Sequence, residues 1–435
     1  MEKEEKHSEG HILLNYEADF TDNLRFSGQY YRVSNDTYLR RYPIEHTDDQ
    51  FPWADSFGKL EYFGNQSYAF ASLMDFESMR RYIPRKNMPL VSTLNYSYTT
   101  KPFWNGLYSI STLNGNDVYR KTNENVARLS YEQSFILPYI SSFGFVFENT
   151  LTGRFDGYNT TEDSGENRNV SRFYANAATK ISYPLMQAGE NYSQVIEPII
   201  MGVWSPNIDT KKNISNEDCV DVFFDDVNLF TTNRYNGFDR VETGSRLNYG
   251  LKWSLYGPKN MYLSAMLGQS YRFSGAEKRL NQDGFEKHFS AYVGHLNMDF
   301  KDFGVGYRFR VSKEKLEHEL SEARVYAGRD PLRISISYLY LKASDELITQ
   351  KALKDREEIY FHVSSKVTQN WSTYGYYRYD LSDGGGPTEE GLGIQYDNEC
   401  LTLLFTVEKD LTKDLNYKGD TSYFLRAVFK TLGSV

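Results

Sequence analysis

Residues Leu247–Leu255 read LNYGLKWSL, and in this stretch apolar and polar side chains strictly alternate. Successive side chains of a β-strand point to opposite faces of the sheet, so a period of two places one class on each face. The apolar face carries Leu247, Tyr249, Leu251, Trp253 and Leu255. The other face carries Asn248, Gly250, Lys252 and Ser254. The stretch therefore predicts a strand with one apolar and one polar face.

The same alternation recurs along most of the chain. It is clear in FGVGYRFRV (Phe303–Val311), in NLRFSGQY (Asn23–Tyr30) and in RISISYLY (Arg333–Tyr340). Repeated strands with this pattern are typical of a transmembrane β-barrel, although a soluble antiparallel sheet also keeps one polar face. The number of such segments and their aromatic ends favour the barrel. We therefore predict an all-β fold, a large antiparallel transmembrane β-barrel, with roughly twenty strands in this chain.

The composition supports this interpretation. The 435-residue chain has 36 Tyr and 28 Phe, yet only 40% of its residues are hydrophobic. No apolar run reaches the roughly 18 residues of a membrane-spanning helix, but barrel strands expose apolar side chains only at alternate positions. A net charge of −9 argues against nucleic acid as a partner.

Polar segments of two sizes separate the predicted strands. Short turns are expected at Tyr256–Asn260, Lys301–Gly304 and Ala343–Glu346, and longer loops at Tyr158–Asn169, Ser205–Cys219 and Ser274–Lys287. Outer-membrane barrels alternate short periplasmic turns with long external loops in this way. The stretch Val311–Val325 has a helical composition, and a charged loop fits it equally well.

Residues that could support catalysis are few. The sequence has no HExxH, G-x-S-x-G or P-loop motif. His46 lies near Asp48 and Asp49, as in a hydrolase site at a barrel rim, but a solvated loop is the favoured interpretation. Asp383–Pro387 is rich in glycine and lacks the lysine of a phosphate-binding loop, so we expect a turn there. We predict no catalytic residue and no cofactor.

A cluster of acidic residues lies upstream of Leu247. Such a cluster could bind a divalent cation, but a solvated acidic loop is the favoured interpretation, and we predict no metal site. Its members are Glu217, Asp218, Asp221, Asp225 and Asp226. The two cysteines, Cys219 and Cys400, have no cysteine or histidine at zinc-ligand spacing beside them and permit at most one internal disulfide.

Charges of both signs are concentrated just before Leu247. Arg234, Arg240 and Arg246 are balanced by Asp239 and Glu242, with no nucleophile or electrophile beside them. Arginine and carboxylate groups form paired hydrogen bonds that fix local geometry. We therefore predict a structural network inside the barrel rather than an active site. Whether these arginines also face passing lipid phosphates stays open at this point.

Four segments, in order, resemble the family of lipopolysaccharide-assembly outer-membrane proteins called LptD or organic solvent tolerance proteins. They are SNDTYLRRY (Ser34–Tyr42), QVIEPIIMGVWSPN (Gln194–Asn207), SNEDCVDVFFDDVNLFTTNRYNGFDRVETGSRLNYGL (Ser215–Leu251) and YDNECLTLLFTVEKD (Tyr396–Asp410). The third segment is the most specific, and the resemblance spans Leu24–Gly433. With the family pattern, the predicted lumen network comprises Asn233, Arg234, Gly237, Asp239, Arg240, Glu242 and Arg246.

The resemblance implies a twenty-six-stranded barrel of the bacterial outer membrane that transports lipopolysaccharide into the outer leaflet. It also implies an LptE-like lipoprotein plug in the lumen, an LptA-like periplasmic bridge, an N-terminal jelly roll that receives the lipid, and no enzymatic activity. A polar lumen can carry the sugar head, whereas acyl chains must leave sideways through a weak strand seam. The alternatives are a passive porin-like channel or a non-functional barrel fragment.

The sequence also departs from the family pattern. We expect residues 1–23 to be a short polar segment or a remnant of an earlier strand, and residues 24–435 to form the barrel. The jelly roll and the first barrel strands are expected to be absent, and the start lacks a secretory signal, which suggests a truncated or split reading frame. Family cysteines near the position of Cys400 pair with N-terminal cysteines. Cys400 is therefore expected to lack its partner, and a Cys219–Cys400 disulfide is less favoured.

Overall fold

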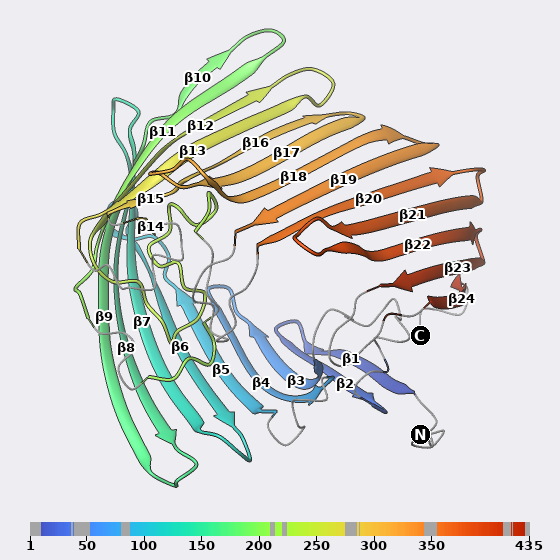
Figure 1. Ribbon diagram of the computed structural model, residues 1–435. Helices are drawn as coiled ribbons and strands as arrows, with labels where there is room; N and C mark the ends of the chain where they lie inside the picture. Colours follow the sequence, from blue (N-terminus) through green and yellow to red (C-terminus); the bar gives the residue numbers. More distant parts are fainter. Residues whose placement is uncertain are drawn as a thin grey trace.

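The chain forms one antiparallel β-sheet that curves through most of a circle (Figure 1). The computed structural model describes residues 10–35, 38, 53–79, 88–208, 214–219, 224–274, 285–286, 288–342, 355–411, 419 and 421–430. Within these residues the sheet has 24 strands, and no helix is long and apolar enough to cross a bilayer. The predicted all-β fold class is confirmed.

Most strands that follow one another in the chain also pair in the sheet, except that β9 pairs with β11 and that β13 pairs with β15 and β16. Their bounds are β1 (His11–Thr21), β2 (Leu24–Val33), β3 (Trp53–Phe63), β4 (Ser67–Ser78), β5 (Leu90–Thr99), β6 (Tyr108–Tyr119), β7 (Asn125–Ile140), β8 (Val146–Thr161), β9 (Asn167–Ser182), β10 (Leu185–Ala188), β11 (Ser193–Trp204), β12 (Arg246–Tyr256), β13 (Tyr262–Arg272), β14 (Phe285–Glu286), β15 (Phe289–Ser290), β16 (Tyr292–Phe300), β17 (Phe303–Val311), β18 (His318–Arg329), β19 (Leu332–Leu341), β20 (Arg356–Lys366), β21 (Trp371–Asp380), β22 (Gly386–Asp397), β23 (Leu401–Asp410) and β24 (Thr421–Phe429). A 3-10 turn, η2 (Trp104–Gly106), precedes β6.

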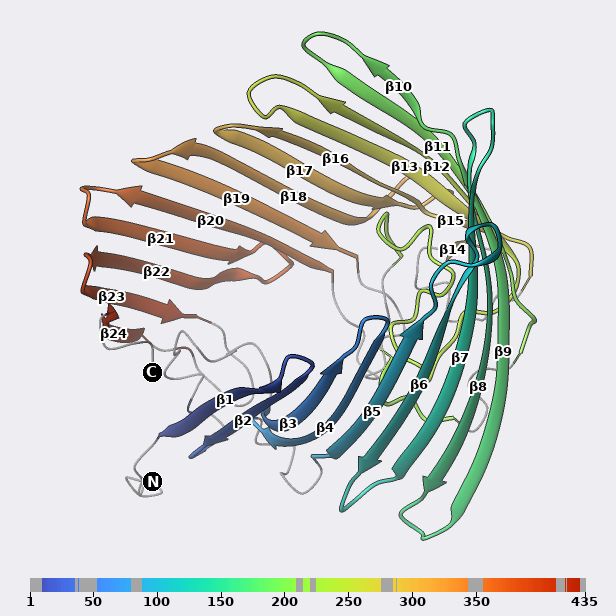
Figure 2. The same ribbon diagram turned by 180° about the vertical axis from the view of Figure 1, so that it is seen from behind.

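The described part of the sheet is not closed. Among the described residues β1 pairs only with β2 and β24 only with β23, and these two edge strands lie on either side of a gap (Figures 1 and 2). We expected residues 1–23 to be either a short polar segment or a remnant of an earlier strand. Residues His11–Thr21 of this range form strand β1. It pairs with β2 from His11 opposite Val33 to Thr21 opposite Leu24.

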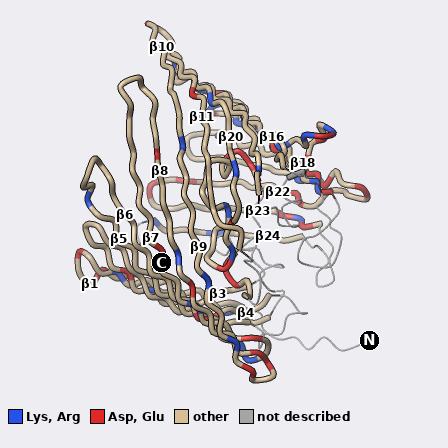
Figure 3. Tube along the Cα trace, turned by 90° about the vertical axis from the view of Figure 1, so that its left-hand side faces the viewer, with Lys and Arg blue, Asp and Glu red and all other residues tan. Residues whose placement is uncertain are grey.

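The two faces of the sheet differ in the way that the alternation predicts. On β12, Leu251 is 50% exposed on the outer face, whereas Asn248 is fully buried on the inner face. Large apolar side chains are exposed on the outer face of other strands as well, among them Leu94, Leu129, Phe173 and Leu267. Long stretches of the strands carry no charge (Figure 3). An apolar outer face around a polar interior is the arrangement that a barrel in a lipid bilayer requires.

The longest connections all lie at one end of the sheet, here called the loop end. They are residues 34–52, 205–245, 273–284 and 342–355. The opposite end, the turn end, has short connections. Two predicted turns are confirmed there, one after Tyr256 and one at residues 301–302, whereas Ala343–Glu346 lies outside the described residues.

Two predictions about connections are wrong. Tyr158–Asn169 is not a long loop, because β8 continues to Thr161 and β9 begins at Asn167. The side chains of Asn159 and Asn169 lie opposite each other and form a 2.7 Å hydrogen bond, so polar residues extend this hairpin instead of ending it. The helical alternative for Val311–Val325 also fails, because β17 ends at Val311 and β18 begins at His318 after a turn.

The described residues of the connection between β11 and β12, which are 205–208, 214–219 and 224–245, lie inside the curve of the sheet (Figure 1). We call these residues the inner segment. Phe224 and Leu229 of this segment pack against Met266 of β13 and Val293 of β16 in a small buried cluster. Burial of this apolar cluster holds the middle of the inner segment against the inner face of the sheet.

Candidate functional site

The inner segment binds the inner face of the sheet through two charged clusters, and the first is centred on Arg128 of β7. The guanidinium Nη1 of Arg128 lies 2.7 Å from Asp218 Oδ2 and 2.6 Å from Asp239 Oδ1. Its Nη2 donates to Asn114 Oδ1 of β6 at 2.7 Å. We call these residues the Arg128 cluster. One strand arginine therefore joins two acidic residues that lie 21 positions apart in the inner segment.

Asp218 and Asp239 also bind the backbone beside each other. The Asp218 carboxylate accepts hydrogen bonds from the amides of Phe238 and Asp239, both at 3.0 Å, and Asp239 Oδ2 accepts from the amides of Glu217 and Asp218 at 2.7 and 3.1 Å. Burial acts to raise the pKa of Asp218, but Arg128 and the two amides outweigh it and lower that pKa to about 2. Burial raises the pKa of Asp239. These reciprocal bonds close the loop between the two acidic residues.

Gly237 is required by this close approach. A Cβ atom at this position would lie 2.4 Å from Asp218 Oδ1 and 2.5 Å from the Asp218 carbonyl oxygen. Both distances are shorter than real carbon contacts, and the backbone oxygen cannot move aside like the end of a side chain. The glycine of the family pattern therefore leaves room for the Asp218 backbone and carboxylate.

Strands β8 and β9 hold the same loop from a second side. The carbonyl oxygen of Phe238 accepts hydrogen bonds from Arg154 Nη2 at 2.7 Å and from Arg172 Nη2 at 2.5 Å. Both arginines also form ion pairs with the fully buried Asp156, at 3.2 and 2.7 Å. The Phe238 ring lies 5.0 Å from the guanidinium carbon of Arg128, within the range of a cation–π contact.

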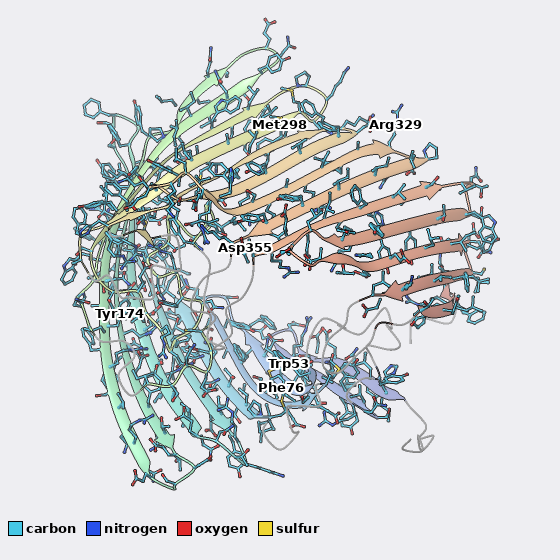
Figure 4. The ribbon with its side chains drawn as sticks, in the orientation of Figure 1. Trp53, Phe76, Tyr174, Met298, Arg329 and Asp355 are labelled. Carbon is cyan, nitrogen blue, oxygen red and sulfur yellow. The ribbon has the colours of Figure 1, made fainter. Side chains whose placement is uncertain are left out.

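The second charged cluster is centred on Glu242. Its carboxylate lies 2.8 Å from Arg234, 3.3 Å from Arg246 and 2.5 Å from Arg272. We call these four residues the Glu242 cluster. Burial would raise the pKa of Glu242, but the three arginines together lower it to about 2. The Glu242 carbonyl accepts a hydrogen bond from Tyr174 of β9, labelled in Figure 4, at 3.1 Å.

The Glu242 cluster holds more positive than negative charge. Arg246 and Arg272 occupy opposite positions on β12 and β13, and Arg234 comes from the inner segment. Backbone carbonyls accept further hydrogen bonds: Arg246 donates to Thr231 and Thr232, and Arg272 donates to Thr243. The side chains of all three arginines are at most 8% exposed. They therefore lie against the protein rather than on a surface that a passing phosphate can reach.

The remaining residues of the predicted network have other contacts. Asn233 Oδ1 accepts a hydrogen bond from the Glu242 amide at 3.0 Å, which holds the chain next to the Glu242 cluster. Arg240 donates to the backbone carbonyls of Ile214 and Asp239, at 3.1 and 3.3 Å. Sequence reasoning missed the strand residues Arg128, Arg154, Asp156, Arg172 and Arg272. These residues alternate with apolar residues along their strands, which predicts that they face the interior. The alternation does not predict which loop they contact.

The acidic residues upstream of Leu247 are not a solvated loop, so that prediction is wrong for the described members. Glu217 lies 2.6 Å from Arg120, and its side chain is only 12% exposed. Asp226 lies 2.6 Å from His295 of β16 and 3.1 Å from Arg308 of β17. Arg120, which follows β6, and Arg308 of β17 compensate the charge of these acidic residues, which allows their burial. Asp221 lies outside the described residues.

Other candidates from the sequence stand apart from these clusters. Among the described residues no three acidic, histidine or cysteine side chains are grouped as metal ligands require. Cys219 is buried, Cys400 is exposed at the turn end, and both are free thiols. Burial raises the pKa of the Cys219 thiol to about 11. Gly385 and Gly386 lie where the β21–β22 connection meets β22, and His46, Asp48 and Asp49 lie outside the described residues.

A curved antiparallel sheet with an apolar outer face and a polar, charge-paired interior defines the class of outer-membrane β-barrel proteins. The fold is similar to the siderophore receptor PirA of Pseudomonas aeruginosa, with a TM-score of 0.51 and 10% identity over 96% of this chain and 75% of that one. PirA of Acinetobacter baumannii gives a TM-score of 0.51 at 9% identity, covering 98% and 78%. At this identity the likeness concerns the fold alone.

Within this class the chain belongs to the LptD family, described as LPS transport system D, which matches residues 7–371. The family resemblance is thereby confirmed, and the first three of the four sequence segments lie within the matched residues. The chain is 22% identical to LPS-assembly protein LptD of Haemophilus influenzae, over 92% of this chain and 55% of that protein. It is 20% identical to the Vibrio cholerae protein of the same name, over 81% and 48%. The chain thus spans about half the length of these relatives.

Proposed function

We propose that this chain is the barrel part of a system that transports lipopolysaccharide into the outer leaflet of the outer membrane. The main support for the proposal is the inner segment, because the most family-specific sequence, Ser215–Leu251, supplies the acidic residues of both charged clusters inside the curve of the sheet. A polar interior suits a phosphorylated sugar head, and an apolar outer face suits acyl chains. Residues 24–435, extended by β1, form the barrel domain in this proposal.

The proposal includes the partners that the family resemblance implies. An LptE-like lipoprotein would occupy the space enclosed by the sheet. An LptA-like periplasmic bridge would deliver the lipid through an N-terminal jelly roll. Lipid transport makes and breaks no covalent bond, so we propose no catalytic residue and no cofactor for this chain.

We propose a structural role for the charged clusters within this function. The Arg128 cluster attaches the inner segment to β6 and β7, and the Phe238 carbonyl attaches it to β8 and β9. The Glu242 cluster attaches it to β12 and β13, and Asp226 attaches it to β16 and β17. The inner segment thus contacts two parts of the sheet, β6–β9 on one side of β11 and β12–β17 on the other. We propose that it sets the distance between these two parts.

Depletion of the gene in its native cell tests the proposed function. We expect newly made lipopolysaccharide to accumulate away from the cell surface, as measured by its access to a lipid A-modifying enzyme of the outer membrane. Restoration by the unaltered gene is the control. Unchanged surface lipopolysaccharide together with a loss of small-solute uptake would overturn the proposal and support a porin-like channel.

A further inference from the structure

The outer face of the last strands carries a groove that is separate from the charged clusters. It has a volume of about 700 Å³ and lies across β19–β24. Its outer-face lining is mainly apolar and includes Phe361, Val363, Tyr377, Leu392 and Val407. Residues opposite each other in the register share a face, and Phe361 lies opposite Tyr377 while Leu392 lies opposite Val407. These side chains therefore form one continuous outer surface.

Gly375 gives the groove its depth. It lies on the same face between Val363 of β20 and Leu392 of β22, and it has no side chain to fill the space between them. A Cβ at Gly375 would lie 2.9 Å from Leu392 Cδ2, so a larger residue would displace Leu392 into the groove. An apolar depression on a surface that faces lipid can take up an acyl chain, because the chain gains dispersion contacts there.

A pair of opposite charges borders the groove toward the loop end. Lys409 of β23 lies opposite Glu390 of β22, and Lys409 Nζ is 3.2 Å from Glu390 Oε1. Both side chains are more than 40% exposed, and Thr421 of β24 lies beside Lys409 on the same face. A lysine ammonium has three N–H donors, so one carboxylate does not satisfy it. This end of the groove can bind an anion.

We propose that the groove binds a phosphorylated glycolipid of the lipid A type, with an acyl chain over Gly375 and a phosphate on Lys409. The long connections of outer-membrane barrels lie on the external side, which places Lys409 toward the outer leaflet. The positive charge of Lys409 complements the lipid phosphate, and the apolar lining complements the acyl chain. The inference rests on the proposed function, and it adds a docking site on the outer surface next to the last strands.

Photo-crosslinking with the full chain, purified from native outer membranes and reconstituted in phosphatidylcholine nanodiscs, tests this site. Tyr423 of β24 is 69% exposed beside the groove and is replaced by p-benzoylphenylalanine. The probe is bis-phosphorylated lipid A. A matched variant carries the same photo-reactive residue at Phe173, which is 65% exposed on the outer face of β9 and lies away from the groove. We expect saturable crosslinking at Tyr423 only.

Two charge substitutions then test the role of Lys409. Lys409→Gln should weaken lipid A binding roughly three- to fivefold, because it removes one partly exposed charge interaction. Glu390→Gln should strengthen binding, because it removes the carboxylate that competes with the phosphate. The control is Lys342→Gln, since Lys342 forms a similar exposed pair with Glu317 outside the groove. All of these positions are partly exposed, so the variants are expected to fold normally.

Three results would overturn the inference. Equal, non-saturable crosslinking at Tyr423 and Phe173 would mean that bulk lipid covers both positions. Insensitivity to both charge substitutions would remove Lys409 from the site. Equal competition by phosphatidylglycerol would mean that the groove accepts any anionic lipid. The crosslinking and binding experiments measure lipid A binding without transport, so their results can be told apart from those of the depletion experiment. If depletion has no effect on surface lipopolysaccharide but the groove still binds lipid A, the proposed function fails and the binding site stands.

Discussion

The two charged clusters of the inner segment have inverse compositions. In one, the single arginine Arg128 lies between two carboxylates, whereas in the other the single carboxylate Glu242 lies among three guanidinium groups. Carboxylates that lose a cationic partner can take up a proton at moderate pH, but arginine remains charged under all conditions in which a protein folds. The Arg128 cluster can therefore adapt to the loss of its central residue, and the Glu242 cluster cannot.

The largest effect is expected for Glu242→Gln. This substitution leaves three buried arginines without a counter-charge and should lower the free energy of unfolding by about 3–5 kcal/mol. The measurement is urea denaturation of the detergent-solubilised chain, followed by loss of the heat-modifiable band. Glu317→Gln, in the exposed pair with Lys342, is the control and should leave the free energy of unfolding almost unchanged, because solvent screens this pair. Equal effects of the two substitutions would show that the counter-charge of Glu242 contributes no more to stability than an exposed ion pair does.

Arg128→Met should be nearly as harmful at pH 7 but should recover on acidification. In the parent chain the folded pKa of Asp218 is about 2, below the unfolded value of about 3.9, so its contribution is full above pH 4 and is lost toward pH 2. Without Arg128, burial raises the pKa of both acidic residues, and their protonation relieves the repulsion. The urea concentration at the unfolding midpoint of this variant should therefore be higher at pH 5 than at pH 7.

The Glu242→Gln variant provides the comparison for this pH experiment. Its three arginines stay charged at pH 5, so its unfolding midpoint should not recover over the same range. Recovery of both variants, or of neither, would contradict the distinction between the two clusters.

The alternation of residues such as those in Leu247–Leu255 was sufficient to predict strands with one apolar and one polar face. A soluble antiparallel sheet produces the same period, so the number of such segments and their aromatic ends were also needed to predict a barrel. The hairpin at Tyr158–Asn169 was misread because its polar residues pair across the strands instead of forming a loop. Polarity indicates exposure to water, and residues 163–167 at the tip of the hairpin are exposed, but exposure does not determine backbone conformation.

The charged residues before Leu247 were sufficient to suggest ion pairs, but not to identify the partners. Arg128 and Asp239 are 111 positions apart, and Arg272 and Glu242 are 30 positions apart. Which strand arginine meets which acidic residue depends on how the inner segment folds back into the curve of the sheet. The acidic residues were predicted to be solvated for the same reason, because their compensating arginines lie on distant strands.

Gly237→Ala tests the geometry of the Arg128 cluster without changing its charge. The added methyl group would collide with the Asp218 backbone and carboxylate, so we expect a loss of about 1–3 kcal/mol in the free energy of unfolding. Gly386→Ala is the matched control, because a Cβ at that position meets no atom within 4 Å. Denaturation midpoints of the two variants are compared under one condition. A neutral Gly237→Ala would mean that the two halves of the loop do not approach as closely as the reciprocal hydrogen bonds require.

The smallest effect is expected for Arg240→Ala, because Arg240 binds backbone carbonyls and belongs to neither cluster's carboxylate pairs. Loss of its hydrogen bonds to Ile214 and Asp239 should cost about 1 kcal/mol and slightly lower the yield of folded, heat-modifiable barrel. The measurement compares this yield with surface lipopolysaccharide in the same cells. Normal assembly combined with a loss of lipid export would contradict a structural role and assign Arg240 to the transport path. A proportional decrease in both would assign its effect to folding, because fewer assembled barrels then transport less lipid.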